Sequence, residues 1–281
     1  MSKIPQTLTI AGSDSGGGAG IQADLKTFQE LDVYGTSVIT AVTAQNTTGV
    51  SAIFPMSSQA VQAQLTAIGS DFEITSLKTG MLFDPEIIKE TAAAIQRYNW
   101  KKLIVDPVMI AKGGAKLLQQ EAVEALKTHL LPLAYLVTPN IPEAEALTGI
   151  AITNATSRRQ AAEKILMLGA QAVVIKGGHE EDTKYAEDYF LHENGESLLY
   201  RSARIETDQT HGTGCTFAAA VTAELAKGRE LQEAIYTAKE FIQAAISDPL
   251  NIGSGHGPTN HSAYKKDQAE NREAARIEIF R

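Results

Sequence analysis

Short runs of β-branched and other apolar residues alternate along the chain with longer segments in which apolar residues recur every three or four positions. The short runs predict strands and the longer segments predict helices, because side chains on one strand face repeat every two residues and those on one helix face about every 3.6. Helices are expected at residues 21–31, 58–68, 85–98, 121–131, 142–147, 158–168, 213–227 and 231–247. Strands are expected at 7–11, 34–42, 50–54, 77–79, 103–105, 135–137, 172–176, 185–191 and 197–201. This alternation predicts an α/β domain with a largely parallel sheet.

The last two expected strands flank an Asn194-Gly195 turn, which favours an antiparallel pair at a sheet edge. No linker, repeat or low-complexity tract separates two halves, so we expect one domain over residues 1–262. The remaining residues, 263–281, form a charged tail by this interpretation. Nine of the last eighteen residues are charged and their apolar periodicity is weak, which predicts a solvated or frayed segment.

Four of the expected strands end in polar or glycine-containing corners. In open parallel sheets, ligands bind beyond the carboxyl ends of the strands, so these corners are expected to converge on one crevice. The corners are Lys78-Thr79-Gly80, Asp106-Pro107, Thr138-Pro139-Asn140 and Lys176-Gly177-Gly178.

Composition excludes several classes of protein. The 281 residues are 43% hydrophobic and 21% charged, as in ordinary globular proteins, and 25 basic against 33 acidic residues give a net charge of -8. That charge argues against a nucleic-acid or anionic-membrane surface but leaves room for a local cationic pocket. Polar residues interrupt the longest uncharged stretch, 33–70, so no membrane-spanning helix is expected, and residues 1–6 lack the features of a signal peptide. A single cysteine, Cys215, forbids an internal disulfide and fits a reducing compartment, so we expect a cytoplasmic protein.

The segment Gly212-Thr213-Gly214-Cys215 runs directly into an apolar helix. Its glycines let backbone N–H groups turn outward, and the helix dipole adds partial positive charge, so the segment predicts an anion hole. The same dipole would stabilise a thiolate at Cys215, which makes this residue a candidate base or nucleophile. The alternative is a small buried apolar residue that packs the start of the helix.

A glycine-rich loop at residues 12–20 lies between the first strand and the first helix, where phosphate-binding loops occur. It is not a P-loop, because no Gly-Lys-Ser/Thr follows. Close backbone approach to a small ligand and a flexible turn both remain open. Asp24, one turn into the helix, either complements the helix dipole or contacts a ligand.

Asp106, Asn140 and Glu143 supply hard oxygen atoms suited to magnesium, bound directly or through water. Asn140 and Glu143 also have the spacing of a capping box, so a purely structural role is the alternative. Lys112 and Lys176 could meet phosphate groups, although lone lysines are more commonly solvated surface charges.

Seven ordered motifs together closely resemble bacterial hydroxymethylpyrimidine/phosphomethylpyrimidine kinases of the ribokinase-like superfamily. The resemblance runs from the first strand through residues 255–261 and leaves only the charged tail outside. It implies a ribokinase-like three-layer α/β/α sandwich with a largely parallel central sheet and an antiparallel edge. The seven motifs are Thr9-Ile10-Ala11-Gly12-Ser13-Asp14, the stretch that starts Gly17-Gly18-Ala19-Gly20, Ala44-Gln45-Asn46-Thr47, Asp106-Pro107-Val108-Met109, Thr138-Pro139-Asn140 with Glu143, Lys176-Gly177-Gly178-His179 and His211-Gly212-Thr213-Gly214-Cys215-Thr216.

The resemblance also implies an ATP- and Mg²⁺-dependent kinase of thiamine biosynthesis. Such a kinase phosphorylates a small-molecule pyrimidine, 4-amino-5-hydroxymethyl-2-methylpyrimidine, and then phosphorylates the monophosphate to the diphosphate. The resemblance implies a homodimer as well. By position, Gln45 would bind the aminopyrimidine edge, with Asp24 beside a pocket lined by Gly12, Ala19, Gly80, Met81 and Val108. Gly212 to Cys215 would form the anion hole for the γ-phosphoryl group, and Cys215 would take the proton of the hydroxymethyl group. Most sugar kinases of the superfamily carry aspartate at that position. Asp106 and Glu143 would organise Mg²⁺, whereas Lys176, Thr210, Asn140 and Lys112 would face ATP.

Two alternatives to this function stay open. Pyridoxal kinases of the same subgroup carry a second cysteine in the flap after the Val-Met pair, where this chain has Ala111, so the pyrimidine substrate is preferred. A non-catalytic pyrimidine-binding regulator is the other alternative, and the intact Gly-Thr-Gly-Cys segment with Asp106 and Glu143 argues against it.

Overall fold

The computed structural model describes residues 3–109, 120–178, 184–269 and 277–281. Its centre is a ten-stranded sheet in the order β10-β9-β8-β7-β6-β5-β4-β1-β2-β3. The run from β7 to β2 is parallel, and antiparallel pairs complete both edges. The predicted largely parallel sheet with an antiparallel edge is therefore confirmed. The strands are β1 (Gln6–Asp14), β2 (Tyr34–Asn46), β3 (Gly49–Pro55), β4 (Ile74–Thr79), β5 (Leu103–Val105), β6 (Leu136–Val137), β7 (Ala172–Lys176), β8 (Tyr185–His192), β9 (Ser197–Ala203) and β10 (Glu278–Phe280).

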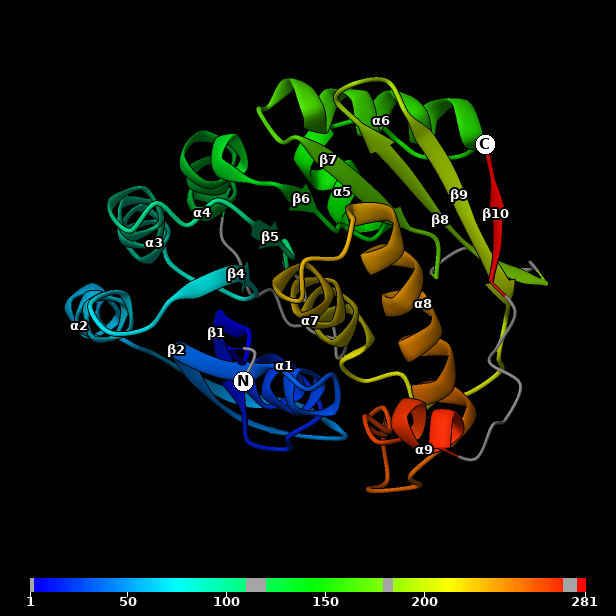
Figure 1. Cartoon of the computed structure of the whole chain (residues 1–281), viewed down its shortest axis with the longest axis horizontal. Coiled ribbons are helices and arrows are strands. Elements are labelled where there is room, and N and C mark those ends of the chain that lie inside the picture. Colours follow the sequence, from blue (N-terminus) through cyan, green and yellow to red (C-terminus); the bar gives the residue numbers. More distant parts are fainter. Residues whose placement is uncertain (1–2, 110–119, 179–183, 270–276) are drawn as a thin grey trace.

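Helices cover both faces of the sheet and make three layers (Figure 1). Helices α2 to α6 pack on one face, α1, α7 and α8 pack on the other, and α9 lies against α8. The helices are α1 (Gly20–Glu30), α2 (Ser58–Gly69), α3 (Pro85–Arg97), α4 (Gln120–Ala125), α5 (Ile141–Thr148), α6 (Ala155–Met167), α7 (Thr213–Ala226), α8 (Leu231–Ser247) and α9 (Ala263–Ala269).

Strand alternation divides the apolar core between these two faces. Ile104 and Val174 pack toward α1, α7 and α8, whereas their neighbours Val105 and Val173 pack toward the helices of the opposite face. All four side chains are fully buried. Because both faces of the central strands are covered, these strands read as continuous apolar runs in the sequence.

The expected helix 121–131 is shorter in the structure. The α-helix α4 ends at Ala125 and continues as a wider π-helical turn, Leu126–Leu130, and then a 3-10 turn, Leu131–Leu133. Pro132 lies in that last turn and cannot donate the backbone hydrogen bond that an α-helix would need.

The described C-terminal residues, 263–269 and 277–281, include a helix and a strand instead of the solvated tail that we expected. Ala263 begins α9 and is buried, and β10 extends the sheet by pairing antiparallel with β9. The guanidinium of Arg201 lies 4.4 Å from the ring centroid of Phe280, which adds a cation–π contact to this pairing. The open edge of β9 supplies hydrogen-bonding partners that charge composition alone does not reveal.

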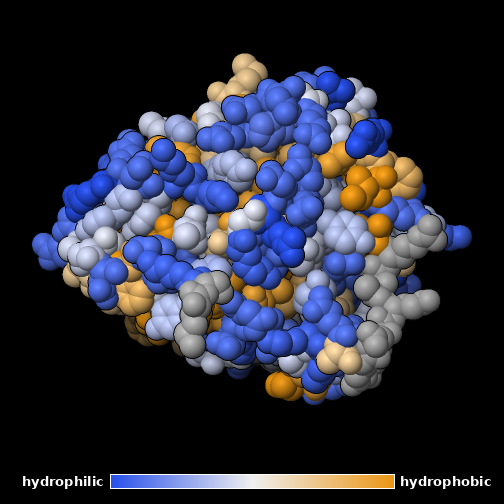
Figure 2. Space-filling view, viewed as in Figure 1, coloured by the Kyte–Doolittle hydropathy of each residue, from blue (hydrophilic) through white to orange (hydrophobic). Residues whose placement is uncertain are grey.

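The face seen in Figure 1 is mainly hydrophilic, with apolar residues scattered over it (Figure 2). Among the described residues, none of the helices combines the length and the apolar character that crossing a membrane requires.

Candidate active site

A cavity of about 750 Å³ opens beyond the carboxyl ends of the parallel strands. The loops that follow these strands form its walls together with the first turns of α5 and α7. The structure thus brings together most of the residues that the sequence singled out. They are Gly12, Ala19, Gln45, Gly80, Met81, Asp106, Val108, Asn140, Glu143, Lys176, Thr210, Gly212, Thr213, Gly214 and Cys215.

Helix α7 starts at the cavity and has no side-chain cap. Its N-cap, Gly212, has a left-handed backbone with φ of 86°, and a Cβ there would lie 1.7 Å from the carbonyl oxygen of Gly18. Glycine is therefore required at this position for both conformation and space. The N–H groups of the first helical turn lack intrahelical acceptors and carry the positive end of the helix dipole, so the geometry suits a phosphate group.

Cys215 lies in that first turn, at the cavity wall. Burial raises the pKa of its thiol to about 12, and the carboxylates of Asp24 and Asp106 act in the same direction. The ammonium of Lys78 and the backbone N–H of Gly20 act in the opposite direction. In the free protein Cys215 is therefore a thiol at neutral pH, which differs from the expectation that the helix dipole stabilises a thiolate.

Asp24 lies beside the cavity, close enough for its carboxylate to act on the Cys215 thiol, but it is not among the lining residues as the alternative of a ligand contact expected. Its side chain is fully buried between α1 and the sheet, where Lys78 Nζ donates to Oδ1 at 2.9 Å and to Oδ2 at 3.0 Å, and Thr9 Oγ1 donates to Oδ2 at 2.6 Å. Asp24 follows Ile21 by three residues and so shares the helix face that packs on the sheet. Lys78 belongs to a strand corner that we expected to face the crevice, but its side chain is fully buried and does not line the cavity. A lysine inside a buried strand requires a buried partner, which is Asp24.

The carboxylate of Asp106 faces Lys176 at the ends of β5 and β7. Lys176 Nζ donates to Asp106 Oδ1 at 3.1 Å, whereas the buried Oδ2 has no hydrogen-bond partner within the described residues. Burial alone would lower the pKa of Lys176, but Asp106 and Glu143 raise it. Lys176 is therefore a firmly charged cation at the cavity.

Asn140 and Glu143 form the predicted capping box at the start of α5. Asn140 Oδ1 accepts from the Glu143 N–H at 2.9 Å, and Glu143 Oε2 accepts from the Asn140 N–H at 2.8 Å. Burial raises the pKa of Glu143 to about 7, with Asp106 adding to the rise and Lys176 opposing it. Both residues also line the cavity, so capping and a role toward a ligand are compatible.

The glycine-rich loop is a folded turn organised by Asp14. The Asp14 carboxylate accepts from the N–H groups of Gly16, Gly18 and Ala19 at 2.8, 3.1 and 2.8 Å and lies 2.8 Å from His211 Nε2. Burial opposes the ionisation of Asp14, but His211 and these backbone donors hold its pKa below its usual value.

Gly18 lets this loop approach the segment before α7, because a Cβ on it would lie 2.5 Å from His211 Cδ2. Sequence reasoning assigned no role to Asp14 or His211. A local signal for Asp14 does exist, because an aspartate just before a glycine-rich turn commonly accepts hydrogen bonds from the backbone N–H groups that follow it, as in an Asx turn.

Gln45, near the end of β2, is the polar group at one end of the cavity. Its carboxamide lies between Thr43 and His211 and beside an apolar wall that includes Met81 and Val108. A flat ring with a hydrogen-bonding edge fits a wall of this kind.

The opposite end of the cavity contains polar residues that the sequence reasoning missed. Lys239 Nζ donates to Asp188 Oδ2 at 2.6 Å, and Gln243 Nε2 donates to the Ala203 carbonyl at 2.6 Å. Both Lys239 and Gln243 come from α8, whose periodicity is that of an ordinary amphipathic helix, so no local motif marks them. Lys112 and the flap at residues 110–116, including Ala111, lie outside the described residues.

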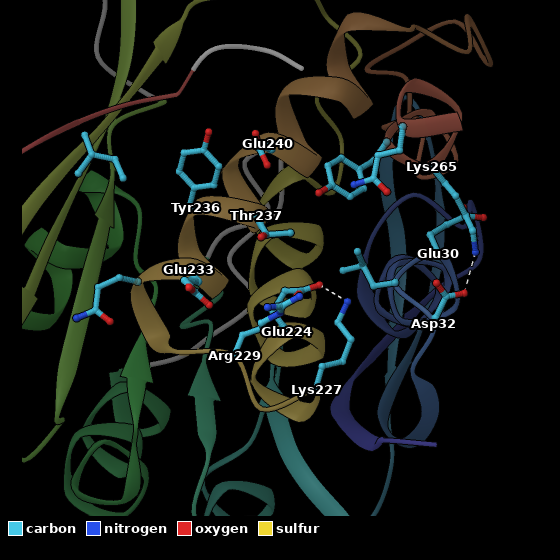
Figure 3. A pocket seen from close by; sticks show the side chains of 15 residues that line it. Glu30, Asp32, Glu224, Lys227, Arg229, Glu233, Tyr236, Thr237, Glu240 and Lys265 are labelled. Atoms are coloured by element: carbon cyan, nitrogen blue, oxygen red, sulfur yellow. Dashed lines mark hydrogen bonds and ion pairs between the residues drawn. The ribbon is translucent and has the colours of Figure 1, made fainter. Parts of the chain in front are cut away.

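A second cavity, of about 530 Å³, lies at the other end of α7 and along α8. Lys227 there pairs with Glu224, and Lys265 pairs with Asp32 (Figure 3). The labelled carboxylates outnumber the cations, so phosphate groups would be repelled. We therefore place the candidate active site in the first cavity. The carboxylates that line the second cavity are those of Glu30, Asp32, Glu224, Glu233 and Glu240.

Comparison with known proteins gives consistent matches over nearly the whole chain. Residues 14–260 match the family model described as phosphomethylpyrimidine kinase. A hydroxymethylpyrimidine/phosphomethylpyrimidine kinase from Haemophilus influenzae is 59% identical over 268 residues, which cover 95% of this chain and 100% of the relative. The pyridoxal kinase from Staphylococcus aureus, solved with AMP-PCP and pyridoxal, is similar at a TM-score of 0.89 and 36% identity over 99% of both chains. A phosphomethylpyrimidine kinase structure from Clostridium difficile is similar at a TM-score of 0.77 and 47% identity, covering 87% of this chain and 100% of that one.

Proposed function

Because this chain belongs to the phosphomethylpyrimidine kinase family, we propose that it phosphorylates 4-amino-5-hydroxymethyl-2-methylpyrimidine and then phosphorylates the monophosphate to the diphosphate. These are two ATP-dependent steps of thiamine biosynthesis. The enzyme is a phosphotransferase, and nucleotide use agrees with the AMP-PCP complex of the S. aureus relative.

One structural observation carries the proposal: the uncapped start of α7 faces the same cavity as Gln45, Asp106 and Lys176. The cavity thereby combines a group that can bind a pyrimidine edge, donors for a phosphoryl group and a cation for the nucleotide. A non-catalytic regulator needs the first feature but not the other two.

Magnesium fits the residues present. The buried Oδ2 of Asp106 lacks a hydrogen-bond partner among the described residues, and Glu143 brings a second carboxyl group to the cavity. Mg²⁺ in kinase sites takes one or two carboxylates and completes its coordination with waters and phosphate oxygens. We propose that Asp106 and Glu143 hold the ion, which would neutralise charge on the phosphates.

The first transfer then has a simple atom balance. The hydroxymethyl oxygen forms a bond to the γ-phosphorus, the bond from that phosphorus to the β–γ bridging oxygen breaks, and ADP leaves. The hydroxyl proton passes to the thiolate form of Cys215, and Gly212 to Cys215 donate N–H groups to the γ-phosphoryl oxygens. Lys176 and Thr210 orient ATP, and the sequence offers Asn140 and Lys112 as further candidates for the same role.

The proposed function is tested by an assay of ATP turnover with Mg²⁺ on hydroxymethylpyrimidine, its monophosphate and pyridoxal, with products identified by mass spectrometry. We expect both pyrimidines to be phosphorylated and pyridoxal to react far more slowly. Faster turnover of pyridoxal would favour a vitamin B6 kinase, as the S. aureus relative is named. Absence of turnover on all three would favour the regulator.

Asp106→Asn is expected to weaken the Mg²⁺ dependence of the reaction. The substitution keeps the shape of the side chain but removes the negative charge proposed to hold the ion and to pair with Lys176. We expect the Mg²⁺ concentration for half-maximal rate to rise at least about tenfold, since charge-assisted contacts contribute about 1.5–3 kcal/mol. An unchanged Mg²⁺ titration would remove Asp106 from the metal site.

We also propose a cytoplasmic homodimer, the state that the family resemblance implies. A lone cysteine suits a reducing compartment, and the exposed Phe54 and Val42 face each other across the edge pair β2–β3, where a second copy would cover them. A monomeric mass in analytical ultracentrifugation would contradict the dimer, and recovery in a non-cytoplasmic cell fraction would contradict the location.

A further inference from the structure

The carboxamide of Gln45 lies between two groups that can fix its orientation. In the structure Gln45 Nε2 lies 3.3 Å from His211 Nε2, and Gln45 Oε1 lies 3.1 Å from Thr43 Oγ1. A carboxamide can rotate by 180° about its last bond and exchange its oxygen and nitrogen, so its neighbours decide which atom faces which side.

On one side, the neighbour is a donor. His211 Nε2 lies 2.8 Å from Oδ2 of Asp14, an ionised carboxylate that only accepts hydrogen bonds, so Nε2 carries a proton and donates. A nitrogen that donates cannot accept from the NH₂ group of Gln45. Turning the carboxamide by 180° removes this contact between two donors. The Gln45 oxygen then faces His211 and shares the single Nε2 proton with Asp14, which takes the shorter hydrogen bond at 2.8 Å.

On the other side, the neighbour is an acceptor. Thr43 Oγ1 has one proton, which it donates to the Ser13 carbonyl at 2.9 Å. Its lone pairs remain for the NH₂ group of Gln45. Both neighbours thus favour the same orientation, with the Gln45 oxygen toward His211 and the nitrogen toward Thr43.

This orientation leaves one lone pair on the oxygen and one N–H on the nitrogen for a ligand. An aminopyrimidine presents an amino donor next to a ring-nitrogen acceptor, which matches that pair. We propose that His211, held between Asp14 and Gln45, is a positioning residue that orients the Gln45 carboxamide and so selects rings with an amino group beside a ring nitrogen. This inference rests on the proposed function, because it takes Gln45 as the group that reads the pyrimidine.

His211 is itself held firmly, as a positioning residue must be. The backbone N–H of His211 donates to the Gly257 carbonyl at 3.0 Å, and the backbone carbonyl of His211 accepts from the Thr259 N–H at 3.3 Å. Its ring also packs on Gly18. A ring that lacks the amino group would leave the Gln45 oxygen short of a partner, and the fixed carboxamide could not turn to compensate.

The test is the ratio of two dissociation constants, measured by calorimetry. The ligands are 4-amino-5-hydroxymethyl-2-methylpyrimidine and its analogue without the amino group. We expect the parent protein to prefer the amino compound by at least about tenfold, the size of one hydrogen bond left unmade. His211→Leu should lower this preference by about tenfold, because the carboxamide is then free to rotate. His211→Gln should keep the preference, since its side-chain nitrogen can still donate toward Asp14 and Gln45.

Two further variants keep the proposal falsifiable. Thr43→Val removes the other orienting group and should also reduce the preference, so it decides the matter if His211→Leu fails to fold in a melting assay. Gln45→Ala should abolish the preference for the amino compound and gives the ratio of dissociation constants expected without the carboxamide. If His211→Leu folds and keeps the parent ratio of the two dissociation constants, the proposed role of His211 is wrong, whatever the absolute affinities. The proposed function is not affected by that outcome. If the parent protein binds neither pyrimidine, the proposed function falls as well.

Discussion

Cys215→Ala is expected to lower kcat for the first phosphoryl transfer by about 10²–10⁴, the usual contribution of a general base. The second transfer should fall by less than about tenfold, because its nucleophile is a phosphate oxygen that is already ionised near neutral pH. The substitution keeps the backbone N–H of residue 215 and thus the anion hole. Only the step that must lose a hydroxyl proton is deprived of its base.

The pH dependence of the two steps follows from the same argument. Burial raises the pKa of the Cys215 thiol to about 12, so the thiolate is a minority below that pH, and its fraction grows about tenfold for each unit of pH. The kcat/KM for hydroxymethylpyrimidine should therefore rise between pH 7 and 9, whereas the value for the monophosphate should change little above about pH 7.

Single-turnover measurements with each substrate as the starting material separate the two transfers. Cys215→Asp is the matched control, because it supplies a base that is ionised over this pH range, as in the sugar kinases named above, and should flatten the profile of the first transfer. Equal losses in both steps of Cys215→Ala would show that the thiol serves the phosphoryl group rather than the proton.

The fold followed from the sequence where apolar periodicity was strong. The central strands, buried on both faces, and the long helix α8 (Leu231–Ser247) were located correctly because their patterns depend on local spacing. β10 was missed because its pairing depends on the distant edge of β9. A three-residue strand in a charged segment has too few apolar positions to show a period.

The site was predictable only as far as motifs reached. The segment Gly212 to Cys215 and the corner at Asp106 carry local signals, and the structure brings them into one cavity. The partner of Asp24 was not predictable, because the sequence places Asp24 near the site but does not give the direction of its side chain. Lys78 fixes that direction from a strand 54 positions away. The Asp14–His211 contact joins residues 197 positions apart and has no local pattern at all.

Gly212→Ala is expected to lower kcat for both transfers by about 10²–10³, the effect of losing one donor to a developing oxyanion. An alanine Cβ at this position would lie 1.7 Å from the Gly18 carbonyl oxygen and 2.8 Å from its carbon, so backbone must move against backbone. The start of α7 then shifts away from the γ-phosphoryl position. Because both transfers use the same donors, both should slow, unlike the pattern for Cys215→Ala.

Gly228, just beyond the end of the same helix, provides a matched control. Its φ is 84° against 86° for Gly212, but a Cβ there meets nothing within 4 Å. Gly228→Ala should therefore lose only the roughly 1–2 kcal/mol that a left-handed alanine costs, seen as a lower melting temperature with normal kcat. If Gly212→Ala shows a similar loss of stability and the same kcat as Gly228→Ala, left-handed strain explains both, and the start of α7 does not hold the transferred phosphoryl group.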